Sequence, residues 1–218
     1  MSEKGLQLTE RDYEIIRLVY RFRFCLGRHI RELAGFSGTR ATDRRLKLLV
    51  EAKYLERKKY LYGVPYLYTV AHKGRILIGV NKRADKIRVD RITHDTHVLD
   101  TVCYFIKKYG FTLADMITEK ELHANDGFGN RRHYPDFILI RSGKLHAVEI
   151  EISLKSKDRL YKNGKDNFLV ADHQIWVVNK KERKLYESIE QMKEEYPNIV
   201  IIYLEDVIDY VSGNNNNG

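Results

Sequence analysis

Three helical hydrophobic patterns precede two strand-like ones within the first 80 residues of the chain. Apolar residues recur with a helical period in the segments 9–23, 26–34 and 39–52. The runs YLERKKYLY and YLYTV, rich in tyrosine and separated by Gly63-Val64-Pro65, then predict a β-hairpin. A short helix is expected at 71–79, before the basic stretch NKRADKIR. This order restricts the N-terminal part to a small helical unit that carries a hairpin.

The second half of the chain alternates between strand and helix patterns. Strands are predicted at 115–122, 137–140, 145–152, 174–178 and 199–204, and helices at 91–109, 155–163, 182–195 and near the C-terminus. The segment 123–132 is expected to be a polar loop. The sequence therefore predicts a two-domain chain of the α+β or α/β class, with domains at 1–89 and 90–211 and a disordered tail at 212–218.

Positive charge is concentrated in the first part of the chain. Residues 1–90 contain 21 Lys and Arg against 10 Asp and Glu, whereas residues 91–218 contain 18 against 20. Such an uneven distribution is expected when a nucleic-acid-binding module is joined to a second domain. Three helices followed by a basic hairpin are typical of a winged helix-turn-helix, so 1–89 is predicted to be a winged-helix DNA-binding domain. The alternative is that the charge only keeps the surface solvated.

The predicted DNA contacts lie on the third helix and on the hairpin, or wing. In a winged helix the third helix enters the major groove, and cations beside it neutralise phosphates. An ordinary surface helix also carries charge on its outer face, which is the alternative interpretation. The candidate DNA-binding residues are Arg40, Arg44, Arg45 and Lys47 on the helix and Arg57, Lys58 and Lys59 on the hairpin.

Tyrosines accompany the cations of the hairpin. Aromatic rings on a basic surface can stack on nucleic-acid bases. At strand spacing, however, aromatic residues more often pack within the sheet, so we expect packing for these residues. The tyrosines concerned are Tyr54, Tyr60, Tyr62, Tyr66 and Tyr68.

No segment has the features of a membrane span or an export signal. No run approaches the roughly 18 consecutive apolar residues that a membrane helix needs, and the start MSEKGLQLTERDYE has no apolar core. Cys25 and Cys103 are too few and too far apart for a disulfide framework or a cysteine-based zinc site. We therefore expect a cytoplasmic protein without a membrane partner.

Acidic residues interrupt strands of the second half that are otherwise apolar. Asp136 follows Pro135 at the start of one predicted strand, and Glu149 and Glu151 lie on the next. Because alternate residues share one face of a strand, the two glutamates point to the same side, where strand pairing can bring Asp136 beside them. Three neighbouring carboxylates favour a hard cation such as Mg²⁺. Alternatively, this face of the sheet is exposed to solvent and the acids pair with nearby basic residues.

This arrangement resembles the core of the PD-(D/E)XK nucleases, in which Pro-Asp is followed by a Gly-containing turn and by paired charged residues on the next strand. With the predicted winged helix, the helix containing THDTHVLD and the run VEIEISLKS, the chain resembles the replication-relaxation family of mobile genetic elements over most of residues 8–180. The resemblance implies that Asp136 and Glu149 bind Mg²⁺ or Mn²⁺, assisted by the carbonyl of Ile150.

The sequence departs from the nuclease pattern at the last motif position. Active enzymes of this core have a lysine there, which orients the attacking water and stabilises developing charge. This chain has Glu151 instead. Lys155 or Lys157 could reach the same place from the following turn, and Glu119, on the predicted strand 115–122, could be an extra ligand. The candidate catalytic residues are therefore Asp136, Glu149, Glu151 and Lys155.

The resemblance implies a double-stranded DNA-binding protein of a plasmid or other mobile element that acts in replication, relaxation, mobilisation or their regulation. Its nuclease-like domain is expected to be degenerate and to serve as a scaffold for a homodimer or for contacts with replication or mobilisation proteins. Two alternatives stay open: an active Mg²⁺-dependent DNA endonuclease or nickase, and a transcriptional regulator or antitoxin that binds palindromic operators.

Overall fold

The structure, a computed structural model, describes residues 6–83, 85–125 and 133–213. The chain divides into two compact units, Met1–Leu99 and Asp100–Gly218, which we call unit 1 and unit 2. The division falls inside helix α5 (Ile92–Tyr109), later than the boundary after residue 89 that the sequence suggests. The segments 126–132 of the predicted loop and 214–218 of the predicted tail lie outside the described residues.

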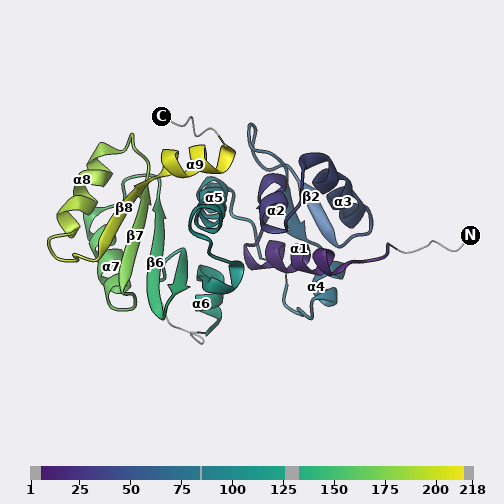
Figure 1. The fold of residues 1–218 in the computed structure, drawn as a ribbon, viewed down its shortest axis with the longest axis horizontal. Coiled ribbons are helices and arrows are strands. Elements are labelled where there is room, and N and C mark those ends of the chain that lie inside the picture. The colour runs from purple at the N-terminus through teal and green to yellow at the C-terminus, as the bar shows by residue number, and fades with distance from the viewer. Residues whose placement is uncertain (1–5, 84, 126–132, 214–218) are drawn as a thin grey trace, which may run out of the picture. The chain divides into compact units, whose positions relative to one another are not determined.

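Unit 1 combines helices with a small antiparallel sheet (Figure 1). Its elements are α1 (Glu10–Arg21), β1 (Cys25–Leu26), α2 (Gly27–Leu33), α3 (Thr39–Glu51), β2 (Leu55–Lys58), β3 (Leu67–Val70), α4 (His72–Leu77) and a 3₁₀ turn, η1 (Val89–Arg91). The strand order is β1-β3-β2, and β2 and β3 form a hairpin with Leu55 opposite Val70. The three predicted helices and the predicted hairpin are therefore present.

Local sequence explains where these elements begin and which faces they bury. Helix α1 starts after Thr9, whose backbone N–H and hydroxyl both donate to Asp12 Oδ2, at 2.6 and 2.8 Å, in a capping box. The apolar stripes of the three helices meet over the sheet, and Ile16, Leu46 and Leu67 are completely buried there. Burial of these stripes fixes which face of α3 points outward.

The first strand of this sheet is a correction to the sequence prediction. Leu26 was expected within the second helix, but Cys25 and Leu26 form β1, paired antiparallel with Tyr68 and Leu67. A strand of two residues is too short to show a period of two, so hydrophobic periodicity could not separate it from the following helix. Helix α2 begins one residue later, at Gly27.

Unit 2 is built on a mixed sheet of five strands in the order β4-β5-β6-β7-β8. The pairs β4/β5 and β5/β6 are antiparallel, whereas β6/β7 and β7/β8 are parallel. After α5, its elements are η2 (Leu113–Asp115), β4 (Met116–Thr118), α6 (Glu119–Asn125), β5 (Phe137–Arg141), β6 (Lys144–Glu151), α7 (Lys157–Phe168), β7 (His173–Val178), α8 (Arg183–Met192), β8 (Ile199–Tyr203) and α9 (Leu204–Ser212).

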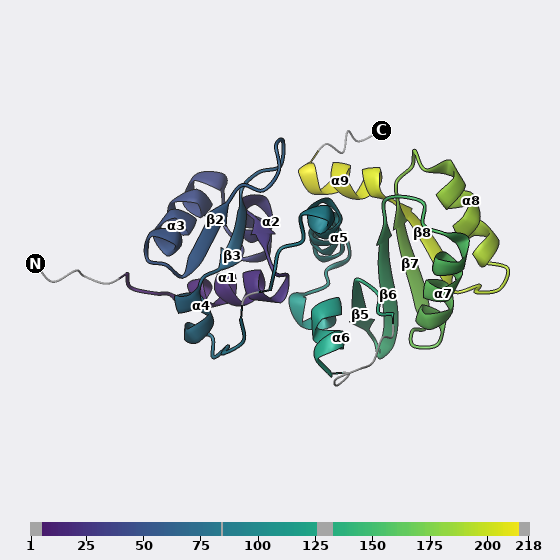
Figure 2. The same cartoon turned by 180° about the vertical axis from the view of Figure 1, so that it is seen from behind.

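Helices cover both faces of this sheet (Figures 1 and 2). On one face, α7 and α8 bury Trp176 and Val178 of β7 together with Leu160 and Ile189. On the other face lies α5, whose Phe105 ring packs edge-on against Phe137 of β5. Because helices cover both faces here, a charged side chain in the buried part of β6, residues 147–151, is removed from water and needs a partner.

Two helices of unit 2 differ from the sequence prediction. The expected strand 115–122 ends at Thr118, whose N–H and hydroxyl donate to Glu121 Oε2 at 2.8 and 2.9 Å and so begin α6. Glu119 therefore lies on a helix and not on a strand. Helix α7 begins at Lys157 and continues through Gly164, where a side chain would overlap Met192 of α8. The glycine thus permits close helix packing and does not end the helix.

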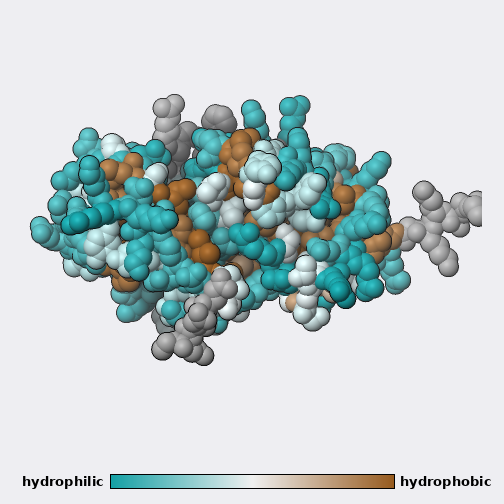
Figure 3. Space-filling model, turned by 90° about the horizontal axis from the view of Figure 1, so that it is seen from above, coloured by the Kyte–Doolittle hydropathy of each residue, from teal (hydrophilic) through white to brown (hydrophobic). Residues whose placement is uncertain are grey.

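The described residues form helices and two sheets, which places the chain in the mixed α+β class. Among these residues, no helix combines the length and the apolar character that crossing a membrane requires. On the face shown in Figure 3, hydrophilic surface separates the hydrophobic patches from one another.

Candidate nucleic-acid interface and carboxylate cluster

The outer face of α3 carries three of the predicted DNA contacts. Thr42, Leu46 and Leu49 point into the core, so Arg40, Arg44 and Lys47, which are all exposed, lie on the solvent side. Within the described residues, neither Arg40 nor Arg44 forms an ion pair, and Lys47 Nζ lies 3.7 Å from Glu51 Oε1. Arg40 and Arg44 are therefore available to an anionic partner, and Lys47 would have to leave Glu51 to bind one.

Arg45 differs from its neighbours on α3. Its Nε donates to Asp12 Oδ1 at 2.7 Å, one of its Nη atoms pairs with Asp12 Oδ2, and the same atom donates to the Gln7 carbonyl at 3.0 Å. Asp12 is completely buried, and burial alone would raise its pKa, but the donors from Arg45 and Thr9 outweigh burial and lower the pKa of Asp12. The sequence placed Arg45 among the DNA contacts, whereas the structure shows it tying α3 to α1.

A basic pocket of about 230 Å³ lies between α2, the start of α3 and the hairpin. Arg28 and Arg31 of α2 line it together with Arg57, whose guanidinium lies 3.9 Å from the centre of the Tyr66 ring. Arg31 also donates to the hydroxyl of Thr39 at 2.7 Å. Arg28 and Arg31 were not among the predicted contacts, although their spacing of three residues on a helix indicates that they share a face.

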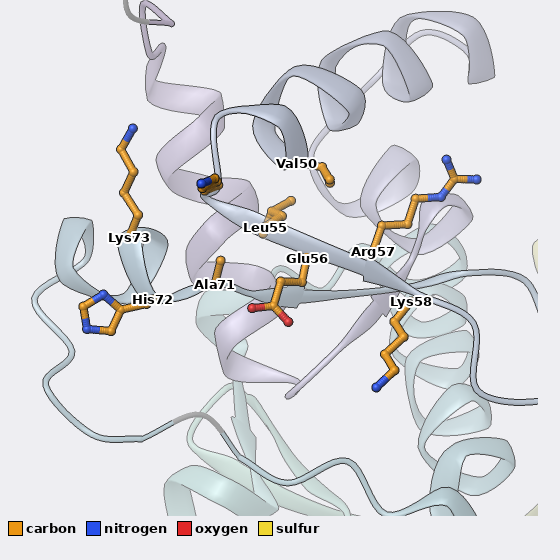
Figure 4. Close-up of a pocket in the computed structure, with 9 residues that line it drawn as sticks. Val50, Leu55, Glu56, Arg57, Lys58, Ala71, His72 and Lys73 are labelled. Carbon is orange, nitrogen blue, oxygen red and sulfur yellow. The ribbon is translucent and has the colours of Figure 1, made fainter.

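The predicted cations of β2 do not share one face of the strand. Figure 4 shows Arg57 and Lys58 leaving β2 on opposite sides, as strand alternation requires. Val50, Leu55 and Ala71 contribute the apolar part of an open cleft of about 610 Å³ at the base of the hairpin. Lys59 lies beyond the end of β2, in the connection to β3.

The tyrosines of the hairpin divide into packed and exposed groups. Tyr68 is buried, and its backbone pairs with both Cys25 and Arg57, which confirms the expected packing for this residue. Tyr66 is 43% exposed and Tyr62 is fully exposed, so packing was the wrong expectation for Tyr62. Both residues lie in the hairpin connection, where the Tyr66 ring still lies against Arg57 of β2 but Tyr62 is beyond the paired residues of the two strands.

In unit 2, strand pairing gathers the predicted acidic residues on one face of the sheet. Phe137 pairs with Val148, so Asp136, one residue earlier, lies opposite Glu149. Glu149 and Glu151 are in register with Trp176 and Val178 of β7. Because the side chains of Trp176 and Val178 pack under α7 and α8, the glutamates point to the same covered face.

Glu149 is held by two residues that the sequence analysis did not single out. Its Oε1 atom hydrogen-bonds His133 Nε2 and accepts from Asn167 Nδ2 of α7 at 3.2 Å. Burial raises the pKa of Glu149, despite the opposing effect of the His133 hydrogen bond. For His133, burial would lower the pKa, but the hydrogen bond and charge of Glu149 prevail and raise it. The only advance signal was the position of His133 just before Pro135-Asp136.

Glu151 has a separate cationic partner in the turn before α7. Lys155 Nζ lies 2.5 Å from Glu151 Oε2, and burial raises the pKa of Glu151 in spite of that lysine. Asp136 Oδ2 accepts the Ile150 N–H at 2.8 Å. The structure thus brings Asp136, Glu149, Glu151 and Lys155 into one cluster. The backbone N–H of Glu119 donates to the Asp136 carbonyl at 3.0 Å, and the Glu119 carboxylate lies 3.8 Å from His123 Nε2 on the same helix.

The fit of a divalent cation to this cluster can be judged from its hydrogen bonds. Mg²⁺ binds one or two carboxylates and keeps several waters. Here Glu149 accepts donors from His133 and Asn167, Glu151 is paired with Lys155, and Asp136 accepts a backbone N–H. In the described part of the chain, no three His, Cys, Asp or Glu side chains are grouped as ligands of one ion. In this arrangement the residues do not fit a metal site.

Comparison with known proteins adds no assignment: no family model, curated protein or solved structure matches the chain significantly. The resemblance to the replication-relaxation family therefore stays a prediction, and the functional interpretation depends on the two clusters of residues described above.

Proposed function

We propose that the chain is a double-stranded DNA-binding protein whose unit 1 is a winged helix that binds duplex through α3 and the hairpin. The observation that carries the proposal is the outward face of α3, where Arg40, Arg44 and Lys47 stand one helical turn apart beside a pocket lined by further arginines. A helix with such a face fits the width of the major groove.

The proposed DNA-binding surface differs from the predicted set in two ways. Arg45 is excluded because its guanidinium is bound to Asp12. Arg28 and Arg31 are included because they line the pocket that also holds Arg57. A guanidinium group is planar and presents its N–H donors as a fork, which matches two oxygens of one phosphate. Arginines around a pocket are therefore suited to bind phosphate. These residues would contact the phosphate backbone together with the exposed cations of α3, and the helix itself would lie in the major groove.

For unit 2 we propose a PD-(D/E)XK-like domain that serves mainly as a scaffold. This proposal is supported by the hairpin of β5 and β6, by the parallel pairing of β7, and by the acids Asp136, Glu149 and Glu151 on one face. The scaffold would support a homodimer or contact replication or mobilisation proteins of a plasmid or other mobile element, in the cytoplasm. The mobile-element setting is carried by the family resemblance alone.

The DNA-binding proposal is tested with an electrophoretic mobility shift on a long mixed-sequence duplex. Arg40→Ala/Arg44→Ala removes two exposed cations from α3 and is expected to weaken binding about tenfold or more at moderate salt, because two phosphate contacts are lost. Arg183→Ala/Lys184→Ala removes the same charge from exposed positions of α8 and is the matched control. Equal binding by the two double variants would contradict the proposal.

A second candidate, a Mg²⁺-dependent endonuclease or nickase, is favoured by one observation. Lys155 reaches Glu151, and so brings a lysine to the motif position where the sequence lacks one. The cluster would have to rearrange before it could hold Mg²⁺ or Mn²⁺. Supercoiled plasmid incubated with either ion is expected to stay intact under our main proposal. Metal-dependent nicking that is lost in Asp136→Asn and in EDTA would establish the second candidate.

A further inference from the structure

The connection between β2 and β3, residues 59–66, presents aromatic rings to solvent, and we call it the wing tip. It projects from the sheet of unit 1 in both views of the fold (Figures 1 and 2). Tyr62 is fully exposed, Tyr66 is 43% exposed and Tyr60 is partly exposed. Gly63, at φ 78°, holds the left-handed conformation that turns the chain beside Tyr62. The fold of unit 1 therefore does not use the Tyr62 ring.

Each tyrosine of the wing tip stands close to a cation from the same hairpin. Arg57 lies 3.9 Å from the centre of the Tyr66 ring, Lys58 lies 5.1 Å from that of Tyr60, and Lys59 lies 5.8 Å from that of Tyr62. These are cation–π distances. Aromatic faces and positive charges thus alternate along the hairpin, as do the bases and phosphates of a single nucleic-acid strand.

This combination points to unpaired bases more than to intact duplex. In duplex DNA each base is covered on both faces by its neighbours, so an aromatic ring gains a stacking partner only where a base is unstacked. Cations alone suffice for the duplex backbone, because phosphate contacts need no aromatic ring. Proteins that hold single strands combine a positive surface with aromatic rings on which the bases stack.

We propose that the wing tip stacks Tyr62, assisted by Tyr60, on unpaired bases, so that the preferred ligand is duplex DNA containing a short single-stranded bubble or junction. The inference rests on the proposed function, because α3 would hold the adjoining duplex while the wing tip engages the opened strand. Lys58 and Lys59 neutralise phosphates of that strand next to the stacked bases.

The test compares three DNA ligands of equal length by fluorescence anisotropy: a duplex, the same duplex with a central bubble, and a single strand. The wild-type chain is expected to bind the bubble more tightly than the duplex. Tyr62→Ala should weaken bubble binding about fivefold or more, because stacking on one base contributes roughly 1–3 kcal/mol. Its duplex binding should stay unchanged. Tyr62→Phe, which keeps the ring, should bind the bubble as the wild type does.

Lys59→Ala is the matched control for charge. It should weaken bubble binding through the loss of a phosphate contact, so this loss should shrink at higher salt, whereas the loss in Tyr62→Ala should depend little on salt. A fluorescent adenine analogue placed in the bubble gives a direct signal, since stacking on Tyr62 is expected to change its emission in the wild type and in Tyr62→Phe but not in Tyr62→Ala. Because Tyr62 is fully exposed, these variants are expected to keep the wild-type melting temperature.

The outcomes separate this inference from the proposed function. If duplex binding depends on Arg40 and Arg44 but the bubble binds no better than duplex, the inference is overturned and the proposed function stands. If Tyr62→Ala weakens both ligands equally, the ring enters the groove of intact duplex, which also overturns the inference. If the chain binds only the single strand, and this binding depends on Tyr62, then Tyr62 stacks on bases as proposed. The same result would overturn the proposed duplex-binding function.

Discussion

Two adjacent arginines on α3 have opposite environments. Arg44 is exposed and has no ion pair among the described residues, whereas Arg45 is bound to a carboxylate that is completely buried. In the sequence both belong to one basic stretch, RRLK, and composition cannot separate them. The difference arises because the Asp12 carboxylate, which completes the capping box of α1, also faces α3 at the position of Arg45. Adjacent cations of α3 therefore differ in role: Arg45 holds α3 to α1, and Arg44 is left exposed to solvent.

Arg45→Ala is expected to destabilise unit 1 by about 2–3 kcal/mol, because it leaves the buried Asp12 carboxylate with fewer donors. The pKa of Asp12 is lowered in the folded state, so this stabilisation is present above the unfolded pKa, near 3.8, and is lost as pH falls through the folded pKa. Thermal unfolding followed by circular dichroism should therefore show a smaller difference between variant and wild type at acidic pH. Arg44→Ala, exposed on the same helix, should match the wild type in stability.

A second residue-scale prediction concerns His133 and Glu149, whose pKa values are both raised. A raised pKa means that the folded chain binds the proton more tightly, so the contribution of His133 is complete below its unfolded pKa, near 6.5, and is lost as pH rises through the folded pKa. The raised pKa of Glu149 has the same effect on the unfolding free energy, but its contribution begins to fall at a lower pH, near the unfolded pKa of 4.5. The unfolding free energy of unit 2 is therefore expected to fall as pH rises above neutrality.

Urea unfolding followed by the fluorescence of Trp176 measures this dependence, because Trp176 is the single tryptophan of the chain and is buried in unit 2. The double variant His133→Gln/Glu149→Gln keeps a hydrogen-bonding pair without charge and should lose this part of the pH dependence. His123→Gln, an exposed histidine on α6, should retain it. An unchanged pH profile in the double variant would show that other groups cause the dependence.

At the scale of elements, contacts between distant segments determine which residue types a position accepts, and local sequence patterns do not show these contacts. Gly74 on α4 shows this, because a methyl group at its Cα would overlap the carbonyl oxygen of Tyr54 and touch Val70. The α4 backbone therefore packs directly against the end of the α3–β2 connection. Gly74→Ala is expected to destabilise unit 1 by about 1–3 kcal/mol in thermal unfolding, despite the better helix propensity of alanine. Ile76→Ala, exposed on the same helix, is the control and should change stability little.

The long periodic segments could be predicted from the sequence, and the short or context-dependent ones could not. The hydrophobic period is strong in α1, α3 and α5 and in the hairpin β2/β3, because each buries an apolar face. These elements could therefore be predicted from the sequence. Strand β1 has two residues and no period. Helix α7 passes through Gly164, where Met192 of α8 packs against the glycine, and no local pattern reveals that contact.

The candidate sites follow the same division. Strand alternation predicted that Asp136, Glu149 and Glu151 would share one face of the sheet. The register of β5 and β6 then places Asp136 opposite Glu149. His133, Asn167, Arg28 and Arg31 were missed because their roles depend on which helix or loop packs beside the strands and the hairpin. Tyr62 was assigned to packing because its strand-like spacing hid that it lies in a turn.

At the scale of the whole molecule, charge and its neutralisation differ between the units. Unit 1 carries the basic excess and leaves Arg40 and Arg44 of α3 without an ion pair among the described residues, whereas in unit 2 the buried Glu149 and Glu151 are held by His133, Lys155 and Asn167. We therefore expect an anionic partner to be attracted to unit 1, because Glu149 and Glu151 have their partners within unit 2. This division of charge is the basis for assigning DNA binding to unit 1 and a scaffold role to unit 2.

The salt dependence of duplex binding tests the central claim most directly. The logarithm of the binding constant is measured against the logarithm of salt concentration for the wild type and for Arg40→Ala/Arg44→Ala. If α3 contacts the phosphate backbone, the slope should become shallower by about one unit for each lost contact, and so by about two for this variant. An unchanged slope together with unchanged affinity would contradict the assignment of α3 as the DNA-binding helix.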